Sequence, residues 1–291
     1  MHTPVLLHES ITALDLHDGE VVVDGTFGGG GHSDLILETS KVAKLIAVDL
    51  DEDAGGRFDT RFHDDSRVVF VHDNYKNAEA IIAQVSMSSV NKVLLDLGTS
   101  SFQLDSDTRG FSFKSDTPLL MTLSASGSHT GFTAYDIANE WEETSIADII
   151  FHYGEERAAR KIARLIVEAR AKGPIKTSGA LAQIIEAGIS RRGRIHPATK
   201  TFQAFRIAVN DELVTLKNAL NAWWNVLSPQ GRIAVITFHS LEDRIVKLWM
   251  REQVQADVGR VITKKPITPS KQELAENPRS RSAKLRTIEK I

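Results

Sequence analysis

The sequence predicts an α/β protein built on a Rossmann-like, largely parallel sheet with a helical subdomain inserted into it. Short apolar runs, typical of buried parallel strands, alternate with helical patterns in the first third of the chain. Four consecutive glycines follow the first of these runs, at positions 28–31. Roughly 130 residues separate the fourth run from the fifth, whereas a parallel crossover needs only about a dozen. The alternation predicts the sheet, and the long gap predicts the insertion.

Five apolar runs are the expected strands of the parallel sheet. They are residues 21–23, 45–48, 68–71, 93–97 and 232–238. The tail of the chain adds two β-like runs, separated by a proline- and charge-rich connection. These runs predict an antiparallel hairpin at the edge of the sheet, formed by residues 261–263 and 283–288.

The insertion has the periodicity of several helices. Apolar residues recur at helical spacing after Thr144, from Ala159 to Ile166, and after Thr177, which is a suitable N-cap. A long helix over 201–227 is expected to lead back to the fifth strand. These boundaries predict two domains: a sheet domain of residues 1–107 and 202–291, and an inserted helical subdomain of residues 108–201 that stands over the active edge of the sheet.

The composition excludes several classes of protein. With 291 residues, of which 42% are hydrophobic, the chain is able to bury a real core. The absence of cysteine excludes disulfides and zinc sites built on thiolates. The first residues are too polar for a signal peptide, and no apolar run approaches about 18 residues, so we expect a cytoplasmic protein without a membrane partner. Because the net charge is −3, any surface that binds nucleic acid must be local.

The stretch from Asp24 to Ser33 follows the pattern strand, glycine turn, helix. Consecutive glycines lose much backbone entropy on folding, so a ligand is expected to lie against the bare backbone. Asp49 ends the next strand about 20 residues past the glycines, where a Rossmann-type site keeps its ribose-binding carboxylate.

The details of this stretch favour S-adenosylmethionine over a dinucleotide. A dinucleotide fingerprint would place another glycine where this chain has Ser33. Asp24 at the mouth of the loop favours a cation, and S-adenosylmethionine carries a sulfonium and an amino acid in place of a pyrophosphate. A purely structural loop in some other α/β protein is the alternative interpretation.

Polar residues also follow two other strands of the predicted sheet. Asp96 ends the fourth strand, and His239 and Ser240 follow the fifth. Because parallel strands deliver their carboxyl ends to one edge, we expect these side chains to lie beside the glycine loop.

Two basic clusters are candidate contacts for nucleic acid. Arg191, Arg192 and Arg194 lie in the insertion, and Arg279 and Arg281 lie near the end of the chain, followed by Lys284 and Arg286. Each cluster is also typical of a solvated face, and cations beside an edge strand deter unwanted pairing.

Motifs along nearly the whole chain resemble the RsmH (MraW) family of S-adenosylmethionine-dependent methyltransferases. That family methylates the exocyclic N4 of a cytidine in the decoding region of bacterial 16S ribosomal RNA. The resemblance lies in His2–Leu7, Asp24–Ser33, Leu95–Gly98, Gln103–Asp105, Arg109–Phe113, Tyr153–Arg157, His196–Ala204, Phe238–Lys247 and Asn277–Ser282. It implies a class I methyltransferase sheet, 16S ribosomal RNA within the small subunit as partner, and a monomer or homodimer.

The resemblance also implies the site residues. The cofactor residues of the family fall on Gly30, Gly31, His32, Asp49, Tyr75, Asp96 and Gln103, and no metal ligand is among them. Methyl transfer from a sulfonium needs little acid–base chemistry, but cytosine N4 is a weak nucleophile. A carboxylate that accepts its amine hydrogens would help, and Asp96 is the first choice for that catalytic role.

Two departures from the family pattern leave the function open at one point. Leu120 and Thr122 stand where the family has Asp and Arg, and Thr99 and Phe102 replace Val and Pro. If the missing pair was an internal ion pair, its neutral replacement is nearly harmless, which is the interpretation we favour. If it bound substrate, the chain would be a weakened, RNA-binding assembly factor that retains cofactor. A nicotinamide-dependent dehydrogenase suits the glycine loop alone and is contradicted by Ser33.

Overall fold

The computed structural model describes residues 4–98, 108–113, 116–124, 127, 130–190 and 196–291. It divides the chain into two compact units, one of residues 1–100 and 213–291 and the other of residues 101–212. We call them the sheet unit and the helical unit. Among the helices in the described ranges, none has the length and apolar character needed to cross a lipid bilayer.

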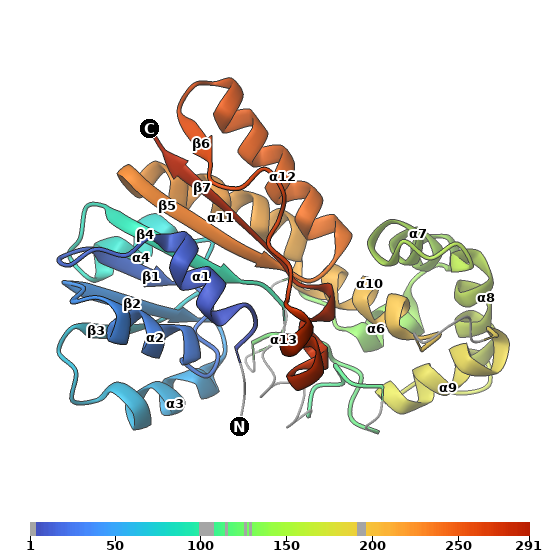
Figure 1. The fold of residues 1–291 in the computed structure, drawn as a ribbon. Coiled ribbons are helices and arrows are strands. Elements are labelled where there is room, and N and C mark those ends of the chain that lie inside the picture. The colour runs from blue at the N-terminus through green and yellow to red at the C-terminus, as the bar shows by residue number, and fades with distance from the viewer. Residues whose placement is uncertain (1–3, 99–107, 114–115, 125–126, 128–129, 191–195) are drawn as a thin grey trace. The chain divides into compact units, whose positions relative to one another are not determined.

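The sheet unit contains a seven-stranded sheet in the order β3-β2-β1-β4-β5-β7-β6 (Figure 1). Strands β1 to β5 are parallel, and β7 pairs antiparallel with both β5 and β6. The predicted Rossmann-like sheet is therefore confirmed, and its strand order reverses at β1, between β2 and β4. The strands are β1 (Val21–Asp24), β2 (Lys44–Asp49), β3 (Val68–His72), β4 (Val90–Asp96), β5 (Leu227–Thr237), β6 (Gly259–Val261) and β7 (Lys284–Lys290).

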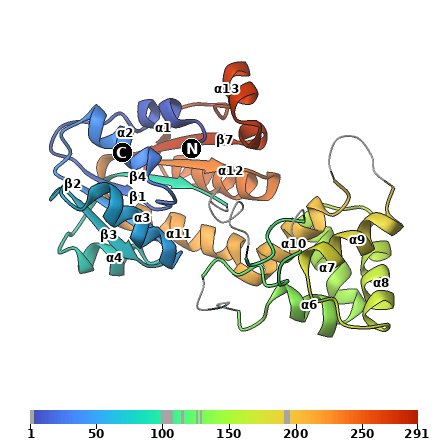
Figure 2. The same ribbon diagram turned by 90° about the horizontal axis from the view of Figure 1, so that it is seen from below.

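Helices cover both faces of the sheet, which is why its parallel strands contain runs of buried apolar residues (Figures 1 and 2). Alternate strand residues enter different cores: Val22 and Leu45 face one side, whereas Val23 and Ile46 face the other. The first side packs against α1 (Leu7–Leu14), α2 (Gly31–Thr39) and α3 (Glu52–Phe62). The second packs against α4 (Ala78–Gln84), α11 (Glu212–Val226) and α12 (Ser240–Gln255).

The tail forms the predicted antiparallel pair at the edge of the sheet, since β6 and β7 pair antiparallel. Strand β7 lies between β5 and β6, so the edge strand is β6. The connection between β6 and β7 contains a helix, α13 (Lys271–Glu276), and a 3₁₀ helix, η1 (Pro278–Ser282). On β7, the Arg286 Nε donates to Asp243 Oδ1 at 2.7 Å and Lys284 Nζ lies 3.1 Å from Asp243 Oδ2. Burial would raise the pKa of Asp243, but these two cations hold it below its ordinary value. Arg286 and Lys284 are therefore counter-ions of α12.

The helical unit is formed by α6 (Ala134–Glu140), α7 (Glu143–Gly154), α8 (Ala159–Arg170), α9 (Ser178–Gly188) and α10 (Thr199–Asn210). Each helix buries apolar residues in one core, which includes Ile150, Ile162 and Phe205. The Thr177 hydroxyl accepts a hydrogen bond from the Ala180 N–H, so the predicted N-cap is confirmed.

The predicted long helix over residues 201–227 is wrong, because the structure has two helices there. Asp211 separates α10 from α11 and has a φ of 49°, in the left-handed region that ends a helix. Helix α10 places Phe202 and Phe205 in the core of the helical unit. The helical unit therefore extends to residue 212, beyond the expected boundary at 201.

The segment with the departures at Leu120 and Thr122 is anchored by Asn210. The Asn210 Oδ1 accepts the Leu123 N–H at 2.9 Å, and its amide donates to the Met121 carbonyl at 2.7 Å. Thr122 is buried in the helical unit and Leu120 is half-buried. A neutral pair at these positions fits an interior site, where an ion pair would have carried a desolvation penalty.

We predict that Asn210→Ala loosens this segment without unfolding the sheet unit. The change leaves the buried Met121 carbonyl unpaired, at roughly 1 to 3 kcal/mol, and removes the partner of the half-buried Leu123 N–H. Hydrogen exchange measured by mass spectrometry should show faster exchange at residues 116–124 than in the parent protein. The control is Asn218→Ala, because Asn218 is exposed on α11. Unchanged exchange at 116–124 in Asn210→Ala would contradict the anchoring role.

Candidate active site

The glycine loop between β1 and α2 is fastened to both neighbours of β1. The Gly25 N–H donates to the Leu94 carbonyl of β4, and the Phe27 N–H donates to the Val48 carbonyl of β2, each at 2.9 Å. The Gly28 N–H donates to Asp49 Oδ2 at 2.7 Å. The loop therefore lies at the carboxyl edge of the sheet, at the point where the strand order reverses and Rossmann-type folds bind ligands.

Two glycines of the loop are required by the packing of the protein itself. Gly30 has a φ of 76°, and a Cβ there would lie 2.8 Å from the Phe27 ring. A Cβ on Gly31 would lie 2.2 Å from Cγ of Pro4. The sequence analysis attributed the glycines to a ligand, whereas these contacts explain Gly30 and Gly31 without one.

Asp49 joins the end of β2 to the loop. Besides the Gly28 N–H, its carboxylate accepts the Asp51 N–H at 2.9 Å. Burial is the largest influence on this group and raises the pKa of Asp49 to about 6. A carboxylate has about four lone-pair sites, so two remain for the hydroxyls of a ribose.

Asp24 is held by Ser33, the residue that departs from the dinucleotide fingerprint. The Ser33 hydroxyl donates to Asp24 Oδ2 at 2.7 Å, and the Thr26 N–H donates to Oδ1 at 3.4 Å. Asp24 is buried, and this burial raises its pKa to about 6. Ser33 therefore positions an acidic group beneath the loop.

Asp96 ends β4 beside the same loop, because its N–H donates to the Thr26 hydroxyl at 2.6 Å. Its side chain is 21% exposed, and Oδ1 has no hydrogen-bond partner among the described residues. Burial, followed by the negative charges of Asp24 and Glu242, raises the pKa of Asp96 well above its ordinary value. An acidic group with a spare oxygen thus faces the loop.

His32 also lies beside Asp96. Its Nδ1 is 3.9 Å from Asp96 Oδ2, and its Nε2 is 3.2 Å from the Val5 carbonyl. Burial lowers the pKa of His32 to about 4, so the ring is neutral near pH 7 and donates from Nε2. The imidazole links the N-terminal segment to the site.

The remaining predicted cofactor residues are only partly accounted for. Tyr75 is half-buried beside the loop, where its Cβ lies 3.6 Å from the position of a Cβ on Gly25, and its carbonyl accepts the Trp223 indole N–H at 2.8 Å. Its contact with adenine stays a prediction. Gln103, together with the departures Thr99 and Phe102, lies outside the described residues.

His239 is the N-cap of α12. Its Nδ1 accepts the Glu242 N–H at 3.4 Å, and the Glu242 carboxylate accepts the Phe238 and His239 N–H groups at 2.8 and 3.2 Å. The sequence analysis missed this reciprocal cap, whose signal is a Glu three residues after a polar residue that precedes a helix. An RNA contact from His239 or from the exposed Ser240 stays a prediction.

Two arginines of α3 hold the loop from outside, and the sequence analysis missed both. The Arg57 Nε donates to the Gly28 carbonyl at 2.8 Å, and the Arg61 guanidinium donates to the Gly29 carbonyl at 2.7 Å. Arg61 also grips Asp34 on α2 with two further donors. The only signal in the sequence is their spacing of one helical turn on the helix that follows Asp49.

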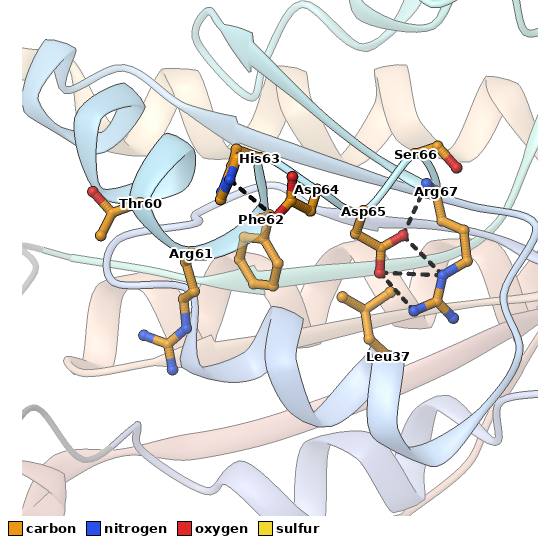
Figure 3. A pocket seen from close by; sticks show the side chains of 9 residues that line it. All are labelled: Leu37, Thr60, Arg61, Phe62, His63, Asp64, Asp65, Ser66 and Arg67. Carbon is orange, nitrogen blue, oxygen red and sulfur yellow. Dashed lines mark hydrogen bonds and ion pairs between the residues drawn. The ribbon is translucent and has the colours of Figure 1, made fainter.

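A hollow of about 540 Å³ lies at the end of α3, where the chain enters β3 (Figure 3). In this hollow, the Arg67 guanidinium donates hydrogen bonds to both oxygens of the Asp65 carboxylate, with Nη2 2.6 Å from Oδ2. Arg61 and Phe62 are its links to the loop region. This hollow contains none of the predicted site residues.

The predicted RNA contacts are divided between described and undescribed parts of the chain. Arg279 and Arg281 are exposed on η1. Arg191, Arg192 and Arg194 lie outside the described residues.

Comparison with known proteins shows the same family along the whole chain. Residues 1–291 match the family described as the MraW methylase family. The chain is 44% identical over 315 residues to the "Ribosomal RNA small subunit methyltransferase H" of Brevibacillus brevis, covering 100% of this chain and 98% of that protein. It is 43% identical over 310 residues to the protein of that name from Clostridium botulinum strain Loch Maree, covering 100% and 99%.

Solved structures with a similar outline are more distant in sequence. An rRNA methylase from Streptococcus thermophilus is 12% identical, with a TM-score of 0.46, over 100% of this chain and 99% of that one. SMU.1697c from Streptococcus mutans, in complex with SAH, is 11% identical, with a TM-score of 0.47, over 100% of both chains.

The full-length family match and the relatives above 40% identity confirm the resemblance drawn from the motifs. The cofactor of this protein is S-adenosylmethionine, as the sequence predicted. The chain belongs to the MraW methylase family.

Proposed function

We propose that this protein transfers a methyl group from S-adenosylmethionine to the exocyclic N4 of a cytidine in the decoding region of 16S ribosomal RNA, in the cytoplasm. The relatives named ribosomal RNA small subunit methyltransferase H support ribosomal RNA of the small subunit as the substrate. The observation that carries the proposal is Asp96, a half-buried carboxyl group with a free oxygen beside the glycine loop.

The residues at the carboxyl edge fit this cofactor. Asp49 has lone pairs left for a ribose, and Asp24 and Asp96 supply the negative charge that suits a sulfonium and an ammonium group. The uncompensated Asp96 Oδ1 is the clearest sign of fit, because a buried polar atom without a partner is costly.

In the proposed reaction the bound cofactor supplies an activated methyl group, and the protein supplies position and a hydrogen-bond acceptor. A nearby positive charge favours the ionised form of Asp96 against its burial. Ionised Asp96 accepts a hydrogen bond from the target amine, which makes the nitrogen lone pair more available, and it then takes the proton that the nitrogen loses on methylation. Holding the nitrogen about 3 to 3.5 Å from the methyl carbon contributes roughly 7 to 11 kcal/mol through proximity.

A weakened, RNA-binding assembly factor is the second candidate, and the departures at Leu120 and Thr122 are the reason to consider it. Both lie in the helical unit, while Asp24, Asp49 and Asp96 are all in place in the sheet unit. Turnover separates the candidates: modified nucleosides of small-subunit RNA should be mapped by mass spectrometry in cells lacking the protein, before and after it is restored. A methyl group on cytidine N4 that returns with the protein supports the enzyme, and its absence in both samples supports the assembly factor.

We predict that Asp96→Asn lowers turnover by at least about tenfold more than it weakens cofactor binding. The amide keeps the position but is a poorer acceptor for an amine that gains positive charge in the transition state. Single-turnover methylation and S-adenosylhomocysteine calorimetry should be measured on the same preparations. Asp64→Asn is the control, because Asp64 is 89% exposed by the hollow. Equal losses in rate and affinity would make Asp96 a binding residue only.

We predict that Asp49→Ala weakens S-adenosylhomocysteine binding by about 100-fold or more. It removes the acceptor proposed for the ribose and the acceptor of the Gly28 N–H, and each hydrogen bond to a charged group is worth roughly 1.5 to 3 kcal/mol. Asp18→Ala is the matched control and should keep the parental affinity. Asp18 also accepts hydrogen bonds from a backbone N–H and a hydroxyl, but it lies before β1. Calorimetry that finds parental affinity in Asp49→Ala would remove Asp49 from the site.

We predict that affinity for S-adenosylmethionine rises with pH through about 6. In the protein without cofactor, burial raises the pKa values of Asp24 and Asp49 to about 6, so both groups retain protons below that pH. A cationic ligand favours the ionised forms, so its binding releases protons near pH 6. Calorimetry in two buffers of different ionisation enthalpy measures this release. Affinity that is constant from about pH 5 to about pH 8 would contradict the prediction.

A further inference from the structure

The Tyr153–Arg157 motif joins the C-terminal end of α7 to α10. The Gln203 amide donates to the Tyr153 carbonyl at 2.8 Å, and the Lys200 Nζ donates to the Glu155 carbonyl at 2.8 Å. A Cβ on Gly154 would lie 2.6 Å from the Lys200 carbonyl oxygen, so only glycine fits this close approach. The first part of the motif is thus explained by the packing of the helical unit.

Glu156 is also used internally, whereas Arg157 is not. The Glu156 carboxylate accepts the Ala158 N–H at 2.8 Å and lies 3.5 Å from Lys200 Nζ. Arg157 is exposed, and within the described ranges it forms no ion pair. These contacts therefore explain the glycine and Glu156 by residue type and leave the arginine.

Arg157 is the first of four exposed cations at the start of α8. We call Arg157, Arg160, Lys161 and Arg164 the α8 basic face. Arg160 lies one turn before Arg164 and Lys161 lies three residues before it, so these three share one face of the helix. Arg157 lies in the turn that precedes α8. At 1.5 Å per residue the three helical positions span about 6 Å along the axis. The opposite side of α8 is apolar and buried, so the orientation of the basic face is fixed by the core.

The stability of α8 does not explain these cations. A helix N-terminus carries partial positive charge, so cations in the first turn are unfavourable by roughly 0.3 to 1 kcal/mol each. The first turn of α8 contains Arg160 and Lys161 and has no acidic residue. The one ion pair that the face makes with a described residue is long and exposed, from Arg164 Nε to Glu143 at 3.9 Å. Such a pair contributes little.

The surrounding sequence concentrates positive charge at the same place. Residues 157–176 contain seven Lys or Arg and one Glu, although the whole chain has a net charge of −3. The Glu of this stretch, Glu168, is exposed one turn after Arg164, whereas the first two turns of α8 carry cations alone. The asymmetry favours a polyanionic partner over solubility alone.

The face fits RNA better than an anionic membrane. A helix that lies on a membrane needs Trp, Phe or Leu beside its cations. Within the part of the chain that the structure describes, the exposed large apolar side chains include Phe151 on α7 and none on α8. Arg and Lys without an apolar anchor are typical of contacts to a phosphate backbone.

We propose that the α8 basic face binds backbone phosphates of the substrate RNA and so holds the RNA on the helical unit. This inference rests on the proposed RNA substrate and adds a surface that neither predicted arginine cluster includes. The contacts are to phosphates, so they position the RNA and carry no base specificity.

The test is the double variant Arg160→Gln with Lys161→Gln in the full chain. Binding to 16S ribosomal RNA should be measured from about 50 to about 200 mM salt. Loss of two phosphate contacts should flatten the plot of log affinity against log salt by about 1.4 for a single strand. The KM for RNA should rise while kcat at saturating RNA and cofactor affinity stay at parental values. The charge-conserving variant Arg160→Lys with Lys161→Arg should keep the parental slope.

A matched control removes two cations elsewhere. Lys264→Gln with Lys265→Gln changes an adjacent, exposed pair on the sheet unit and should keep the parental salt slope. A parental slope in the α8 variant overturns the proposal, as does an equal change in the control, because net charge alone would then explain the effect. The proposal is also overturned if the α8 variant loses binding to vesicles of anionic lipid while its RNA binding is unchanged. If the parent protein itself neither binds nor methylates RNA, the proposed function fails, which is a different result.

Discussion

The structure of the sheet unit depends on how the backbone of Gly28 and Gly29 is held. Asp49 accepts the Gly28 N–H, Arg57 donates to the Gly28 carbonyl, and Arg61 donates to the carbonyl of Gly29. Charged side chains from β2 and α3 thus take hydrogen bonds that a mobile glycine loop would make with water. Because the loop is shaped before cofactor arrives, less ordering entropy is lost on binding. A cluster of edge-to-face aromatic rings, in which Phe27 contacts Phe58 and Phe62, packs beneath it.

Much of the fold follows from local patterns in the sequence. The five parallel strands are marked by apolar runs, and the Thr177 cap by a residue type that accepts a backbone N–H. The break between α10 and α11 has no such mark, because it depends on Asp211 adopting a positive φ in a helical context. The interior place of β7 was also missed, since strand order depends on partners distant in the chain.

The candidate site divides in the same way. Asp24, Asp49 and Asp96 could be expected at one edge because each ends a parallel strand. The raised pKa values of these three groups could not be predicted, because they depend on burial that the sequence does not display. The reasons for glycine at positions 30 and 31 are likewise tertiary, namely the Phe27 ring and Pro4. The role of Arg286 as a partner of Asp243 is another long-range contact, invisible among neighbouring arginines.

Strand β7 has a consequence for the synthesis of the protein. It pairs with β5 on one side and β6 on the other, yet residues 284–290 follow every other strand of the sheet in the chain. Until the ribosome has released them, β5 presents an unpaired hydrogen-bonding edge to the cell, and such edges recruit other chains. Asp243 on α12 is also without its two counter-ions during that interval. The nascent protein therefore passes through a stage in which strands β1 to β5 have been made and the sheet is still open at β5.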